Sequence, residues 1–185
     1  MILPRSGGVV AVIPEIGADL MRGCAVAEIR TWPAPVPGDD GLTLLADTLS
    51  DLVPTHGTIG LPMGAETSLR MPLADYMALA ARLSPRRMVD ATHTVQRMRE
   101  IKSEAETQAI RAACRIADAA FAKLPERLHR AQSFADLSRL FQIDLLEAGA
   151  DWVSYVAGGA GPGGYGNVIA PPGETPLLTG DIVML

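Results

Sequence analysis

The longest regular pattern of apolar and polar positions in the chain lies between residues 103 and 124. Apolar side chains recur there at steps of three and four, which is the period of one helix face. They are Ala109, Ala113, Ile116, Ala120, Phe121 and Leu124. Ser103 can cap this helix, and Glu106 three residues later can complete a capping box. The pattern predicts a long amphipathic helix that begins after Ser103.

A second capped helix is predicted after Ser133, because Asp136 stands three residues later and can close a capping box in its Asp form. An apolar stripe follows, made of Leu137, Leu140, Phe141 and Leu145. Gly149 follows four residues after Leu145, and glycine is favoured where a helix ends in the left-handed conformation. We therefore expect this helix to stop at Gly149.

Two segments near the end of the chain have the pattern of strands, residues 152–157 and residues 180–185. Trp152 and Tyr155 are expected in the core of the first of them. No internal repeat accompanies these patterns.

The segment between these strands, residues 158–166, is rich in glycine and is expected to be a loop. It contains a literal G-x-G-x-x-G from Gly159 to Gly164. A dinucleotide site needs such a loop to open directly into a helix, whose N-terminus holds the pyrophosphate. Residues 165–172 include two consecutive prolines and do not start a helix of that kind. We therefore expect no nucleotide there.

The first 94 residues alternate short strand patterns with helical ones. Strands are predicted over residues 1–4, 9–13, 27–32, 58–61 and 87–92. Helices are expected over 16–22, after a cap at Asp40, and from Pro72 to about Leu83. Such alternation favours an α/β domain, because parallel strands need helical crossovers between them.

Composition excludes several classes of function. The net charge of −5 argues against binding of nucleic acid, whose backbone selects basic surfaces. No apolar run approaches the ~20 residues that a membrane helix needs, and the start of the chain lacks a signal-peptide pattern. A soluble, cytoplasmic protein is expected. Cys24 and Cys114 are interpreted as buried, reduced thiols rather than a disulfide.

The histidines do not form a pattern that predicts a zinc site. His56, His93 and His129 are scattered over a loop, a strand end and a helix end. No two of them stand four residues apart, and none adjoins a pair of carboxylates. The position of His129 is better explained by the helix dipole, which favours positive charge at a C-terminus.

The stretch from Arg97 to Leu124 resembles the domain junction of the creatinase, prolidase and Xaa-Pro aminopeptidase group. Residues 99–106 read Arg-x-x-Lys-Ser-x-x-Glu, and an alanine-rich helix with Ile-Ala-Asp follows. The resemblance covers nearly the whole chain, with both ends cut short. It implies an α/β fold with two parts. A truncated creatinase-like N-terminal α/β domain would be followed by the first part of a pita-bread α+β domain.

The resemblance also implies domain limits and a site beyond the chain. Residues 1–94 would form the N-terminal domain, residues 95–103 a linker and residues 104–185 the start of the catalytic domain. Gly180-Asp181 resembles the family's turn into the strand Gly-Asp-x-Val-x-x-Asp, whose last Asp is the first metal ligand. That ligand would stand directly after Leu185, while Asp181 closes the turn. No catalytic residue or metal ligand is therefore expected in this chain, which alone should be inactive and hold no cofactor.

For the complete protein the resemblance implies a metal-dependent hydrolase that cleaves a peptide or amide C–N bond with two divalent ions, manganese, cobalt or zinc. The family lines its substrate cleft with the glycine-rich loop, which makes Tyr165 and Asn167 candidates for contact with a small peptide or amide. Members often carry a His in this region, and residues 167–170 contain none. A metal-free creatinase-like amidinohydrolase and a non-catalytic binding or dimerisation module are the alternatives. A homodimer is expected.

Overall fold

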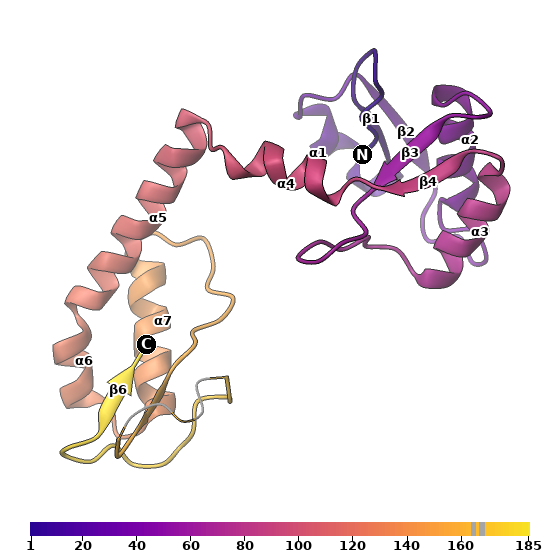
Figure 1. Ribbon diagram of the computed structural model, residues 1–185. Coiled ribbons are helices and arrows are strands. Elements are labelled where there is room, and N and C mark those ends of the chain that lie inside the picture. Colours follow the sequence, from indigo (N-terminus) through magenta and orange to yellow (C-terminus); the bar gives the residue numbers. More distant parts are fainter. Residues whose placement is uncertain (164–165, 167–168) are drawn as a thin grey trace. The chain divides into compact units, whose positions relative to one another are not determined.

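A computed structural model describes residues 1–163, 166 and 169–185. The chain divides into two compact units, Met1–Ile101 and Lys102–Leu185 (Figure 1). The boundary between them falls inside the stretch that the sequence predicted as a linker.

The N-terminal unit is built from short parallel strands and the helices that follow them. Its strands are β1 (Val10–Pro14), β2 (Glu28–Trp32), β3 (Thr58–Leu61) and β4 (Arg87–Asp90). Its helices are η1 (Glu15–Gly17), α1 (Ala18–Arg22), α2 (Leu42–Leu52), α3 (Leu73–Leu83) and α4 (Thr92–Glu100). β1 pairs with β2 and β3 with β4, both in parallel. This arrangement confirms the predicted α/β class.

The core of this unit lies where α2 and α3 pack on the second strand pair. Its buried members are Ala46, Leu49, Ile59, Leu79 and Leu83. A parallel pair needs such cover, because its crossover helix is what removes the apolar strand side chains from water.

The predicted strand over residues 1–4 is reduced to one antiparallel bridge between Ile2 and Val10. The two residues exchange backbone hydrogen bonds of 2.7 and 3.0 Å. The next pair of this ladder would need a donor at Pro4, which has no backbone N–H. The pairing therefore stops after one step.

The starts of two predicted helices differ from the structure by one residue each. Asp40 does not cap α2: its carboxylate accepts the indole N–H of Trp32 at 2.8 Å. Gly41 is the N-cap residue, and Asp39 accepts the Thr43 N–H at 2.9 Å. Pro72 likewise stands at the N-cap of α3 rather than inside the helix.

The last strand of the unit is shorter than predicted, because the chain turns into a helix at Thr92. The Asp90 carboxylate accepts the Thr92 N–H at 2.8 Å and so satisfies a donor at the start of α4. Hydrogen bonds from Thr92 hold the pKa of Asp90 below its usual value. Helix α4 consequently occupies most of the stretch predicted as a linker.

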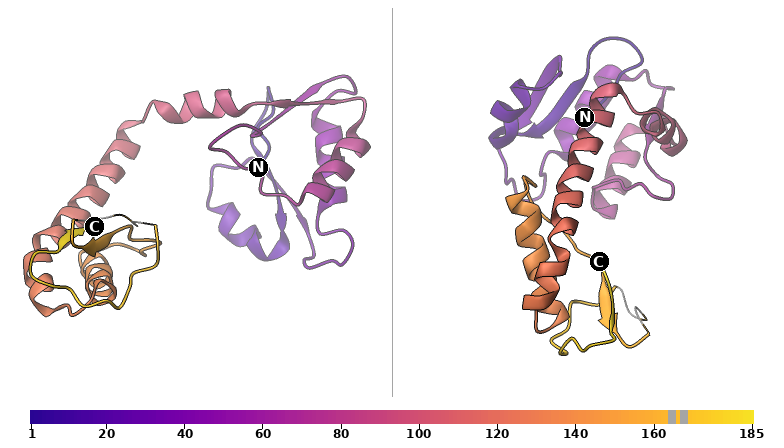
Figure 2. Two further views of the ribbon diagram at one scale, coloured as in Figure 1. Left: turned by 60° about the horizontal axis from the view of Figure 1, so that its bottom comes forward. Right: turned by 90° about the vertical axis from the view of Figure 1, so that its left-hand side faces the viewer.

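The C-terminal unit consists of three helices and a pair of short strands among the described residues. They are α5 (Glu104–Ala122), α6 (Leu124–Arg130), α7 (Phe134–Glu147), β5 (Gly159–Gly161) and β6 (Ile182–Met184). Figure 2 shows α5 and α7 side by side, and β5 pairs with β6 in antiparallel orientation. The strand predicted over residues 180–185 is thus confirmed in its central part.

The predicted starts of α5 and α7 and the predicted end of α7 are confirmed, whereas the long helix predicted from the stripe up to Leu124 ends at Ala122, and Leu124 begins α6. Ser103 and Glu106 form a complete capping box on α5, and Ser133 and Asp136 form one on α7. At the end of α7, Gly149 has φ of 110°. Its N–H and that of the next residue bond back to carbonyls of the last helical turn, at 3.1 and 3.0 Å. This is a Schellman motif.

The predicted strand over residues 152–157 is not formed, and two predictions of burial are wrong. Trp152 and Tyr155, expected in the core, are 74% and 58% exposed. Pairing begins instead at Gly159, opposite Met184. Cys24 and Cys114 are free thiols as expected, but both are exposed because each lies on an outer helical surface or turn.

No helix in the described residues has the length and apolar character needed to cross a lipid bilayer.

Candidate functional site

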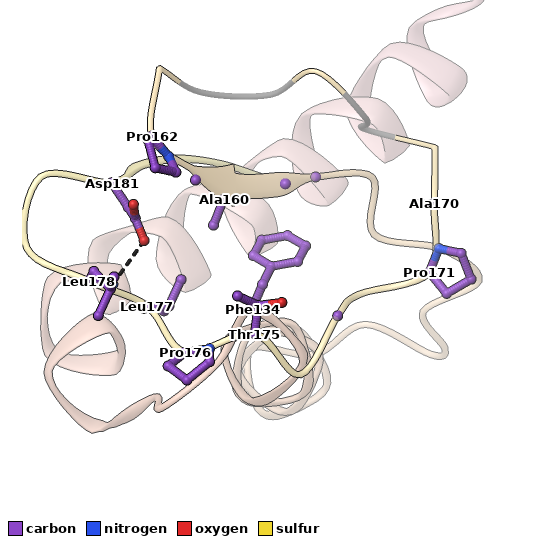
Figure 3. Close-up of a pocket in the computed structure, with 14 residues that line it drawn as sticks. Phe134, Ala160, Pro162, Ala170, Pro171, Thr175, Pro176, Leu177, Leu178 and Asp181 are labelled. Carbon is purple, nitrogen blue, oxygen red and sulfur yellow. Dashed lines mark hydrogen bonds between the residues drawn. The ribbon is translucent and has the colours of Figure 1, made fainter.

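A cavity of about 370 Å³ lies in the C-terminal unit, between β5 and residues 170–178 (Figure 3). Its lining comes from β5, the first residue of α7, and the chain on both sides of the turn into β6. The lining side chains are mostly small or apolar. They belong to Phe134, Ala160, Pro162, Ala170, Pro171, Thr175, Pro176, Leu177, Leu178 and Asp181, and glycines complete the wall.

The wall at β5 is made of backbone that packs closely on its neighbours. A Cβ atom at Gly158 would lie 2.5 Å from the Met184 carbonyl oxygen and 2.6 Å from the Phe134 ring. Only glycine allows the chain to approach both groups. Figure 3 shows the Phe134 ring between the start of α7 and β5, where it is buried. The ring therefore forms the floor of the cavity.

The opposite wall, residues 170–178, is fastened to the start of α7 by backbone hydrogen bonds. Ala135 donates to the Gly173 carbonyl at 3.0 Å, and Leu177 donates to the Gln132 carbonyl at 2.9 Å. Ser133 and Pro176 form an antiparallel bridge between these two bonds. The capped start of α7 thus positions the wall as well as the floor.

Asp181 closes the turn that leads into β6. Its carboxylate accepts the Leu178 N–H at 2.8 Å, and its own N–H donates to the Leu178 carbonyl at 3.1 Å. This is the role that the sequence assigned to it. Among the described residues that line the cavity, Asp181 alone has an ionisable side chain, and that side chain holds a turn. The described lining of the cavity is therefore largely apolar.

The two sequence-predicted contact residues, Tyr165 and Asn167, lie outside the described residues. Pro162 and Ala170, before and after them in the chain, both line the cavity. The sequence did not identify Phe134 or residues 170–178 as part of the site. The prolines at 171, 172 and 176 were the available signal, since they favour an extended segment.

The histidines are not brought together. His56, His93 and His129 are all exposed, and the ring of His129 hydrogen-bonds the Pro125 carbonyl inside α6 at 2.6 Å. In residues 1–163, 166 and 169–185, no three His, Cys, Asp or Glu side chains are grouped as metal ligands.

Comparison with known sequences shows similarity along the whole chain. It is 28% identical over 193 residues to the probable dipeptidase PepE of Mycobacterium tuberculosis and to that of Mycobacterium bovis. The alignment includes 100% of this chain and 47% of the relative, so the chain spans about half the length of these curated relatives. No family model matches the chain.

Solved structures agree with this similarity. Dipeptidase PepE from Mycobacterium ulcerans is 26% identical, with a TM-score of 0.74 over 98% of this chain and 46% of that one. A prolidase from Thermococcus sibiricus has a TM-score of 0.80 at 20% identity, covering 98% of this chain and 47% of that one. An X-Pro aminopeptidase from Thermotoga maritima has a TM-score of 0.70 at 20% identity, covering 94% and 46%.

At 20% identity the last two comparisons establish a common fold alone, whereas the PepE proteins add similarity of sequence. Together they confirm the resemblance predicted from residues 97–124. The chain resembles the creatinase, prolidase and Xaa-Pro aminopeptidase group and has the mixed α/β fold of the N-terminal part of such structures.

Proposed function

We propose that this chain is part of a metal-dependent hydrolase that resembles Xaa-Pro aminopeptidases and prolidases. The observation that carries the proposal is the similarity to PepE dipeptidases along the full 185 residues. The complete protein would cleave a peptide or amide C–N bond in a small substrate. This chain alone would be inactive.

The two units would correspond to two domains of such an enzyme. Residues 1–94 would form the creatinase-like N-terminal domain, and residues 104–185 the start of the pita-bread catalytic domain. The division of the chain between Ile101 and Lys102 supports this assignment, as does the complete capping box that starts α5.

We also propose that the complete protein is a cytoplasmic homodimer.

The cavity between β5 and residues 170–178 would contribute a wall of the substrate cleft. Its apolar lining suits a side chain or ring of a small peptide. Tyr165 and Asn167 are proposed as further contacts, because Pro162 and Ala170 on either side of them line the cavity.

The metal ligands are proposed to lie in the part of the protein after Leu185. When bound, a pair of manganese, cobalt or zinc ions supplies an activated water and polarises the scissile carbonyl. The contribution of Asp181 would be to position β6 through its hydrogen bond to the Leu178 N–H. β6 and Leu185 would then lead to the residue expected as the first ligand.

The reading frame that follows Leu185 gives the first test. An Asp directly after Leu185, and another about eleven residues later, would support the hydrolase. The extended protein should then retain stoichiometric manganese after dialysis and release proline from an Xaa-Pro dipeptide, and a chelator should abolish the activity. The 185-residue chain is the matched control and should do neither.

Two results would contradict this proposal in different ways. Stoichiometric metal and turnover by the 185-residue chain would overturn the placement of the metal centre. An extended protein that is folded but binds no metal would favour a creatinase-like amidinohydrolase or a non-catalytic module. Hydrolysis of a guanidino substrate without metal would separate these last two.

A further inference from the structure

A hollow of about 330 Å³ lies in the C-terminal unit, where α6 ends and α7 begins. Arg130 is the last residue of α6, whereas Asp136 and Arg139 belong to the first two turns of α7. Two helices therefore bring two guanidinium groups and one carboxylate to the same hollow. Its lining consists of Arg130, Gln132, Asp136, Arg139 and Leu140, and among the described residues it has no member in common with the lining of the cavity at β5.

Neither arginine of this hollow has a hydrogen-bonded carboxylate partner among the described residues. Arg130 lies 3.9 Å from a Glu126 oxygen, beyond hydrogen-bond distance, and Arg127 lies 3.6 Å from the same oxygen. The ion pairs of the described residues include none to Arg139. Two like charges that line one hollow repel each other, and an anionic group between them replaces this repulsion with attraction.

The Asp136 carboxylate is held by the backbone at the start of α7. Its Oδ2 atom accepts the N–H groups of Gln132 and Ser133, both at 3.2 Å. In this described part of the chain, neither Arg130 nor Arg139 lies within ion-pair distance of it. The hollow therefore presents positive and negative charge at separate points, with the positive charge in excess.

We propose that this hollow binds a free amino acid with an apolar side chain. Guanidinium groups match a carboxylate with parallel hydrogen bonds, and the Gln132 side-chain amide supplies a further donor. The ammonium group pairs with Asp136, and the apolar side chain lies against half-buried Leu140. The volume is at the small end of ligand pockets, which span roughly 300–1,000 Å³. The inference does not depend on the proposed function.

Calorimetric titration of the 185-residue chain at neutral pH with three ligands tests the assignment. The ligands are L-valine, isovalerate, which is the same acid without its ammonium group, and inorganic phosphate. We expect L-valine to bind most tightly, because it alone offers a cation to Asp136. Phosphate should bind most weakly, because its dianion meets Asp136 as a like charge. NMR signals of the Nε–H groups of Arg130 and Arg139 should shift as L-valine is added.

Three variants assign the binding to particular side chains. Arg139→Gln should weaken L-valine binding about tenfold, the loss expected for one hydrogen bond to a charged group. Arg115→Gln removes an exposed arginine from α5 and is the matched control for net charge, so it should have no effect. Asp136→Asn keeps an oxygen that can accept the two backbone N–H groups, and it should make L-valine bind no more tightly than isovalerate. Circular dichroism checks that each variant is folded.

Absence of saturable L-valine binding would overturn the inference, as would phosphate binding as tightly as L-valine. Equal losses in Arg139→Gln and Arg115→Gln would also overturn it, because general surface charge would then explain the attraction. Equal affinities of the wild-type chain for L-valine and isovalerate would remove the role of Asp136 and with it the assignment of an amino acid. This last comparison needs no variant, so it decides the question even if Asp136→Asn does not fold.

Discussion

Asp144, fully buried in α7, accepts two hydrogen bonds from the Arg127 guanidinium, at 2.8 and 2.7 Å. Lys123 donates to the same carboxylate at 3.1 Å. Lys123 stands at the break between α5 and α6, and Arg127 lies in α6. The three side chains therefore tie the helix break to α7. A bidentate pair of this kind fixes direction as well as distance.

Removal of the Asp144 charge should destabilise the chain strongly. Asp144→Asn leaves two cations beside a neutral buried amide, and breaking a buried ion pair costs roughly 3–5 kcal/mol. We expect the lower end, because Arg127 and Lys123 remain 14% and 40% exposed and can regain water. Urea denaturation measures the free energy of unfolding. Glu147→Gln, which removes an exposed partner of Lys123, is the control and should cost less than about 1 kcal/mol.

The same carboxylate should produce a dependence of stability on acid pH. Hydrogen bonds from Arg127, and then from Lys123, lower the pKa of Asp144 from 3.8 to about 2. A group with a lowered pKa in the folded state contributes stability above its unfolded pKa and loses it as the pH falls through the folded pKa. The contribution, about 2 kcal/mol, should be complete above about pH 5 and vanish only below about pH 2. Unfolding free energies of wild type and Asp144→Asn should converge over that window, and parallel curves would contradict the assignment.

The elements that the sequence predicted well are those determined by neighbours in the chain. The capping boxes at Ser103 and Ser133 depend on residues three positions apart, so local sequence suffices. The end of α7 at Gly149 also depends on residues close by in the chain. These features place α5 and α7, and with them the floor of the cavity.

The elements that it missed depend on partners far away in the chain. Residues 152–157 have a strand pattern, but β6 pairs with residues 159–161, where Gly158 permits close approach. The position of residues 170–178 as a wall of the cavity depends on backbone hydrogen bonds to Gln132 and Ala135, which are distant in the sequence. Alternation of apolar and polar residues shows which side chains share one face of a strand, but it does not show which other strand pairs with it. Trp152 was wrongly assigned to the core for this reason.

Glycine 41, the N-cap of α2, should tolerate no side chain. Its φ is +86°, and a Cβ atom would lie 2.7 Å from three atoms of the Trp32 indole. Gly38 has nearly the same φ, +88°, and in the part of the chain that the structure describes no atom lies within 4 Å of its Cβ position. Gly38→Ala should therefore cost only the left-handed strain, about 1–2 kcal/mol, whereas Gly41→Ala should cost more and should also shift the Trp32 fluorescence. Equal losses of unfolding free energy in the two variants would show that Trp32 moves aside freely.

Substitution of Gly158 should disturb the packing of the cavity walls more than substitution of any other residue that lines the cavity. A methyl group there would overlap the Met184 carbonyl and the Phe134 ring, and overpacking of a filled site costs about 1–3 kcal/mol. Neither neighbour can yield easily, since one is backbone of β6 and the other is the buried first side chain of α7. Gly158→Ala should therefore loosen the β5–β6 pairing and speed hydrogen exchange of its amides. Gly173→Ala lies on the opposite wall, with no atom of the described residues within 4 Å of the new methyl group, and should leave exchange unchanged. Unchanged protection of the β5 and β6 amides in Gly158→Ala would mean that β5 does not pack on α7 as described, and the cavity would lose its floor.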